Sequence, residues 1–176
     1  MRKRPLTVAA LAVLALSGGL VACDEPRMDA LHAKCTTEDL KWKVTVLKKK
    51  ARSTHREGRL SAVNTGSGRC VFGGYPAFRV YLGKGPFANG VGQGRTRPVG
   101  LPSGGRVVID LQYRDPAGRR PAPDDCRITN GHAVAAAPRD TGDGAMAPIR
   151  DEKGRETGMD VCGDVIRMAP PRAAAG

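Results

Sequence analysis

Short runs in which apolar and polar residues alternate, separated by turn-forming segments, determine the fold class of this sequence. The segment 106–113 is the clearest, because Val107, Ile109 and Leu111 share one face of an expected strand. Segment 40–46 alternates in the same way. The chain also holds 23 glycines and 13 prolines among 176 residues, which favours turns over a helical bundle. The pattern predicts an all-β fold, an antiparallel β-sandwich, with a small β-barrel as the alternative.

Weaker apolar runs predict further strands, and other segments are expected to lack regular structure. The additional strands are expected at residues 59–64, 70–72, 77–82, 132–137 and 164–168. The glycine-rich segment 83–105 is predicted to be a loop with at most one irregular edge strand. We expect residues 35–168 to form a single domain and residues 169–176 to be a disordered tail.

The first 22 residues have the layout of a secretory leader. Arg2, Lys3 and Arg4 precede an apolar run at 6–16, which is shorter than the ~20 residues that a membrane-spanning helix needs. The leader ends in Leu20-Val21-Ala22-Cys23, which resembles a bacterial lipobox. That resemblance implies cleavage before Cys23 and attachment of lipid to its sulfur, with residues 23–34 as a spacer. The alternative is ordinary signal cleavage, which would leave Cys23 as a free thiol.

The number of cysteines favours the lipid over the free thiol. The chain has five cysteines, and an exported protein rarely keeps an odd one. If Cys23 carries lipid, the other four can pair. The sequence therefore predicts a protein anchored through acylated Cys23 to the outer face of the cell membrane, in an extracytoplasmic location.

The predicted mature chain is basic, and its charge is concentrated in one segment. Removing residues 1–22 takes three positive charges from the formal net charge of +12, which leaves +9. Segment 48–58 is expected to be the tip of a hairpin. The basic side chains of Lys48, Lys49, Lys50, Arg52, Arg56 and the nearby Arg59 are candidates for polyanion contact, with wall polymer or anionic lipid. The alternative is a merely soluble turn. No aromatic residue interleaves these charges, so specific nucleic-acid binding is not indicated.

Several motifs occur in a characteristic order along the chain. They are Cys35-Thr36 before a strand, the turn Asn64-Thr65-Gly66, the run Cys70-Val71-Phe72-Gly73-Gly74-Tyr75-Pro76, Leu101-Pro102-Ser103-Gly104 before the strongest strand, and the late Cys126 and Cys162. Over about residues 35–168 they resemble the domain of unknown function numbered 4232, although Phe72 stands where leucine is usual. The resemblance implies an immunoglobulin-like sandwich of secreted proteins and lipoproteins in high-GC Gram-positive bacteria. It implies no assigned chemistry.

Four cysteines after the lipobox allow three disulfide pairings. We expect Cys35 with Cys70 and Cys126 with Cys162, because this pairing keeps each bridge local and agrees with the layout that the resemblance implies. Each bridge is worth roughly 3–4 kcal/mol in the chain-entropy description. A zinc site is the competing interpretation, but no two of these cysteines form a C-x₂₋₄-C pair. Export also places them in an oxidising compartment.

No catalytic constellation is visible in the sequence. His32, His55 and His132 fall in three separate segments, and a G-x-S-x-G nucleophile motif is absent. We therefore predict no catalytic residue, no metal and no cofactor. The expected function is a non-enzymatic binding module for an envelope protein or polymer. The alternatives are polyanion docking through the basic hairpin, and a small extracytoplasmic enzyme whose residues converge only in three dimensions.

Overall fold

The computed structural model describes residues 33–51, 53–116 and 124–174, which form strands, turns and no helix. None of these residues therefore belongs to a helix that could cross a membrane. The expected leader, Cys23 and most of the expected spacer lie outside the described residues. The strands are β1 (Leu40–Val46), β2 (His55–Asn64), β3 (Cys70–Phe72), β4 (Ala77–Tyr81), β5 (Phe87–Gly92), β6 (Val99–Leu101), β7 (Arg106–Arg114), β8 (Ile128–Ala136), β9 (Ala145–Met146), β10 (Ile149–Asp151), β11 (Met159–Met168) and β12 (Arg172–Ala173).

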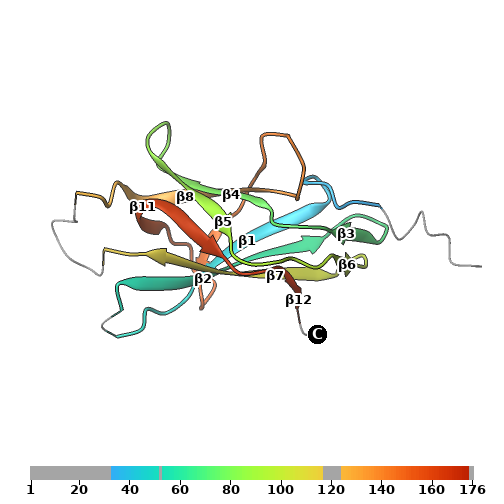
Figure 1. Ribbon diagram of the computed structural model, residues 1–176, viewed down its shortest axis with the longest axis horizontal. Coiled ribbons are helices and arrows are strands. Elements are labelled where there is room, and N and C mark those ends of the chain that lie inside the picture. Colours follow the sequence, from blue (N-terminus) through green and yellow to red (C-terminus); the bar gives the residue numbers. More distant parts are fainter. Residues whose placement is uncertain (1–32, 52, 117–123, 175–176) are drawn as a thin grey trace, which may run out of the picture.

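Two layers of strands face each other, as Figure 1 shows with β2 and β7 on the lower side and β4, β5 and β8 on the upper side. Strand β11 joins the layers. It pairs with β8 at Met159 and Val161, with β7 from Cys162 onward and with β5 from Val165 onward. The ring β11–β5–β4–β8 thus closes on itself, so a small barrel is built into one side of the two-layered arrangement. The all-β prediction is confirmed.

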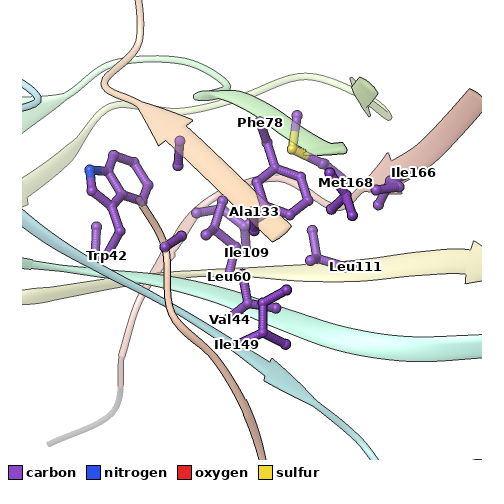
Figure 2. Close-up of a cluster of buried hydrophobic side chains, with 14 of the residues drawn as sticks. Trp42, Val44, Leu60, Phe78, Ile109, Leu111, Ala133, Ile149, Ile166 and Met168 are labelled. Carbon is purple, nitrogen blue, oxygen red and sulfur yellow. The ribbon is translucent and has the colours of Figure 1, made fainter. Parts of the chain in front are cut away.

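The core fills the space between the layers (Figure 2). One layer contributes Val44 of β1, Leu60 of β2 and Ile109 of β7 to this core. The core also contains Phe78 of β4 and Met168 of β11. All five side chains are buried. The alternation that predicted β1 and β7 is therefore the alternation of core and surface, as a half-buried strand requires.

Tyr113, near the end of β7, is buried together with its hydroxyl group. Its hydroxyl is inaccessible to solvent and has no hydrogen-bonding partner among the described residues. Burial raises the pKa of the Tyr113 phenol well above its ordinary value, because the charged form would lose its hydration. The ring contributes to the core, whereas the hydroxyl adds a polar group that nothing in the described structure satisfies.

Strand β5 corrects the expectation that segment 83–105 is a loop with at most one irregular edge strand, because β5 is an interior strand. It lies between β4 and β11, in parallel register with β11. A Cβ atom at Gly90 would lie 2.8 Å from the sulfur of Met168, and one at Gly92 would lie 2.3 Å from the ring of Tyr75. These glycines leave room for large side chains from neighbouring segments, which is one established use of glycine inside a strand.

The C-terminal residues correct a second expectation, that residues 169–176 form a disordered tail. Pro171 is buried, and β12 pairs with β7 at Val107 and Val108. The guanidinium of Arg172 also contacts the carboxylate of Asp110 at 2.9 Å. Pairing along an otherwise open strand, together with this ion pair, orders the segment through residue 174.

Both predicted disulfides are present, linking Cys35 to Cys70 and Cys126 to Cys162. The Cys35–Cys70 bridge ties the segment before β1 to β3, and the Cys126–Cys162 bridge ties the segment before β8 to β11.

Two strand pairs depart from the expected antiparallel arrangement, because β1–β10 and β11–β5 are parallel.

Candidate binding site

A broad trough lies on the outer face of the β4–β5–β8 layer. It has a volume of about 840 Å³. Its floor comes from the outward-facing positions of β4, β5 and β8, and the 83–85 and 142–144 loops rise beside it (Figure 1). A volume of this order is within the range of small-ligand sites.

The trough is hollow because small side chains occupy one end of its floor. In the strand register Ala77 of β4 lies beside Ala136 of β8, and Arg79 lies beside Val134. At the other end Tyr81 of β4 lies beside Phe87 of β5. The alternation of β4 places Phe78 in the core and its two neighbours in the trough, so one strand supports both surfaces.

An arginine lies in the middle of this floor and is held by two neighbours. The guanidinium carbon of Arg79 is 4.5 Å from the centre of the Phe87 ring, and its Nε donates to Oδ1 of Asn89 at 3.3 Å. Stacking on an aromatic face leaves the remaining guanidinium N–H groups free for a carboxylate. Lys84 adds a second positive charge to the lining, and Asp143 adds a negative one.

Exposed apolar side chains gather on this same layer. The large hydrophobic residues that are exposed within the described parts of the chain are Leu82, Phe87, Val91, Met146 and Val165. They belong to β5, β9, β11 and the turn after β4. No such residue lies on the outer face of the β1–β2–β7 layer in the described structure. Exposed apolar side chains concentrated on one face are typical of a binding surface.

One wall of the trough is held in place by a hydrogen-bonded contact between distant segments. Asp140 accepts hydrogen bonds from the Thr37 hydroxyl, from the backbone N–H of Thr37 at 3.1 Å and from that of Gly142 at 3.1 Å. Thr37 in turn accepts from the N–H of Ala137 at 3.0 Å. These bonds, led by the Thr37 hydroxyl, hold the pKa of Asp140 below its usual range. We call this contact the Thr37–Asp140 clamp.

The comparison with known families gives a single match. Residues 35–171 match the family described as "Domain of unknown function (DUF4232)". The chain belongs to this family. No curated protein and no solved structure shows significant similarity to it.

The motifs that resemble the DUF4232 domain have structural roles in this fold. The buried side chain of Asn64 donates to the carbonyls of Leu101 and Pro102 at 3.1 and 3.2 Å, which ties the Asn-centred turn to the segment before β7. The ring of Tyr75 covers Gly92, and its hydroxyl donates to the carbonyl of Gln93 at 2.6 Å. These residues position strands and contribute no chemistry to the trough.

The basic hairpin of this DUF4232 domain is shorter and less free than predicted. Its tip is residues 47–54, because β2 begins at His55 and Arg56 and Arg59 belong to the strand. Lys49 and Arg56 both contact the buried carboxylate of Asp115, at 3.0 and 3.2 Å. Two of the side chains that were candidates for polyanion contact thus form ion pairs with a buried aspartate.

Two of the other candidate contact residues, Lys50 and Arg59, have paired side chains as well. Lys50 contacts Glu57 at 2.5 Å and Arg59 contacts Asp110 at 3.2 Å, whereas Arg52 lies outside the described residues. The Lys48 backbone N–H donates to Glu152 at 2.8 Å. In Figure 1 the tip between β1 and β2 lies at the opposite end of the domain from residue 33, where the described chain begins.

Polar groups of the kinds that enzymes use in catalysis are dispersed over the described structure. The described lining of the trough contains no serine, cysteine or histidine. Asp125 lies near Cys126 and Cys162, but these sulfurs are bonded to each other and are not available to a metal. His55 begins β2 and His132 lies in β8, whereas His32 is outside the described residues. Backbone and side-chain bonds from Arg155 hold the pKa of Asp151 low, and that carboxylate is remote from the trough.

Proposed function

We propose that this chain is an extracytoplasmic lipoprotein and a non-enzymatic binding module, which recognises a segment of an envelope protein in the trough. The single observation that carries the proposal is the concentration of exposed apolar side chains on the layer that bears the trough, whose lining includes Arg79 and Phe87. Two disulfides support an oxidising, extracytoplasmic compartment. The lipobox at Cys23 supports a lipid tether.

The chemistry of the lining favours a partner segment that is apolar and carries a carboxylate. Tyr81 and Phe87 offer aromatic contact area, which often dominates recognition. Arg79 and Lys84 supply two positive charges against the single negative charge of Asp143, so the lining is complementary to an acidic group. We therefore commit to a protein segment with a carboxylate flanked by apolar residues.

Site-specific crosslinking in the native envelope tests the trough. A photoreactive phenylalanine analogue at position 87 is expected to give a discrete adduct, and the same analogue at position 41 is the control. Lys41 is exposed on β1, which lies in the other layer. The adduct at position 87 should disappear when Arg79→Glu reverses the central charge. Equal adducts at both positions, or an adduct that Arg79→Glu leaves unchanged, would overturn the proposed site.

The lipid tether has an independent test. Intact mass of the membrane-extracted chain should show cleavage before Cys23 and the added mass of acyl chains. A Cys23→Ser variant should lose that mass and become extractable from the membrane by high salt, because each buried acyl CH₂ contributes ~0.8 kcal/mol to anchoring. A membrane-free native protein with an unmodified Cys23 would contradict the lipoprotein assignment.

A further inference from the structure

A second cavity lies at the end of the domain where the described chain begins. It has a volume of about 310 Å³. We call it the N-terminal pocket, and its lining includes Lys34, Gly73, Gly74, Thr96, Pro138 and Arg139. The trough is formed by a different set of residues, so the two cavities are distinct sites.

The charged groups in the described lining of the N-terminal pocket are both positive. They are Lys34 and Arg139, and no carboxylate accompanies them. Neither side chain forms an ion pair or hydrogen bond with another described residue, whereas Lys49, Arg56 and several other cations of this domain are paired. Arg95 and Arg97 flank the lining residue Thr96 and add positive charge nearby. A concave surface whose charged groups are all positive attracts an anion.

The backbone around the N-terminal pocket is suited to close approach by a small anion. Gly73 has no atom within 4 Å of the position of a Cβ, so its peptide group is open on that side. Arg139 has a φ of 67°, a left-handed conformation that a non-glycine residue adopts at an energetic cost. The adjacent Thr37–Asp140 clamp maintains it, and Pro138 is buried beside it. The fold thus holds Arg139 at the pocket against its own backbone preference.

The position of the N-terminal pocket relative to the tether points to the source of the anion. Lys34 is eleven residues after Cys23, so the pocket is at most about 40 Å along the chain from the lipidated sulfur. The basic hairpin tip is at the opposite end of the domain (Figure 1). Of these two basic regions, the N-terminal pocket is the one that the tether keeps close to headgroups.

We propose that the N-terminal pocket binds the phosphate of an anionic phospholipid headgroup through Lys34 and Arg139. The phosphate chemistry follows from the pocket itself, whereas the lipid source rests on the proposed tether. The interaction orients the domain with its N-terminal end at the bilayer. The trough and the hairpin tip then remain accessible to other molecules.

Vesicle binding by the mature chain, residues 23–176 with Cys23→Ser, tests this proposal without the covalent lipid. The probes are phosphatidylcholine vesicles with and without phosphatidylglycerol. We expect binding only to the anionic vesicles, and an affinity about 30-fold lower for the Lys34→Ala/Arg139→Ala variant, at ~1 kcal/mol for each cation. The matched control is Lys48→Ala/Lys153→Ala, which removes the same charge from exposed positions near the hairpin end. The control affinity should fall by less than about threefold.

Each remaining outcome bears on the proposal. Equal losses in the two double variants would mean general electrostatic attraction and would overturn the site, as would undiminished binding by Lys34→Ala/Arg139→Ala. Inorganic phosphate should compete with the vesicles. If phosphate perturbs the amide NMR signals of Gly73 and Gly74 while anionic vesicles do not bind, the lipid source is wrong. Failure of Cys23 acylation would appear only in the mass measurement, so it is separable from failure of the pocket.

Discussion

The contact between Tyr75 and Gly92 gives the sharpest test of how this fold is assembled. Replacing Gly92 by alanine would place a Cβ atom 2.3 Å from one carbon of the Tyr75 ring and 2.4 Å from another. Carbon atoms normally approach to about 3.5–4.0 Å, so the ring would have to move by more than 1 Å. That movement would also break the bond from the Tyr75 hydroxyl to the carbonyl of Gln93.

We expect Gly92→Ala to lower the free energy of unfolding by about 1–3 kcal/mol, the usual cost of overpacking a well-filled site. For a domain of this size the melting temperature should fall by roughly 4–12 °C. The single tryptophan, Trp42, is buried in the core, so its fluorescence reports urea unfolding with the disulfides intact. The control is Gly68→Ala, whose Cβ would meet no atom within 4 Å. It should stay within about 1 kcal/mol of the parent.

A double-mutant cycle separates the clash from any general effect of alanine in β5. In a Tyr75→Ala background the ring is absent, so Gly92→Ala should then cost less than about 1 kcal/mol. The coupling energy should be of the same size as the single-mutant loss, as expected for residues in contact. A Gly92→Ala protein with the parent's unfolding midpoint, or a cycle with no coupling, would refute this explanation of the glycine.

Further predictions concern the bridges, the core and the pH dependence of stability. Cys35→Ser/Cys70→Ser should cost about 3–4 kcal/mol in urea unfolding, and an unchanged midpoint would contradict it. Tyr113→Phe should be neutral or stabilising by up to about 1 kcal/mol, because it removes the unsatisfied hydroxyl; a loss above 1 kcal/mol would show that this hydroxyl has a partner. Burial raises the pKa of Asp110, but bonds and charges from Arg172 and Arg59 outweigh it and hold the pKa low. Because this pKa is lower in the folded state than in the unfolded state, ionised Asp110 stabilises the fold above about pH 4. That stabilisation is lost as the pH falls through the pKa of Asp110 in the folded state. Thermal melts of Asp110→Asn and the parent should therefore differ near neutral pH and converge in acid.

Local alternation was sufficient to predict the strands that border the core. Residues 40–46 and 106–113 alternate cleanly, and both form strands with one buried face. Strand β5 could not be found in this way. Its glycines are selected by Met168 and Tyr75, which approach from distant parts of the chain, and sequence periodicity carries no signal for such neighbours. The ordered tail was missed for the same reason, because β12 is stabilised by pairing with β7.

The candidate site was less predictable than the fold. The cationic run at the hairpin was conspicuous in the sequence, but the carboxylate that holds Lys49 and Arg56 comes from Asp115, far along the chain. The trough had no sequence motif at all. Its one local signal was Phe87 at an exposed position within a glycine-rich segment. A residue of this type in an apparent loop is worth examining as a binding residue.

The 137–144 segment is common to both cavities, since Pro138 and Arg139 line the N-terminal pocket and Gly142, Asp143 and Gly144 line the trough. A ligand that restrains this segment at one cavity would reduce the entropy that a second ligand must lose at the other. Thermodynamic linkage makes such an effect reciprocal: contact with the bilayer would strengthen capture of a partner by the same factor as the partner strengthens contact with the bilayer. The more tightly the Thr37–Asp140 clamp already holds the segment, the smaller that factor would be.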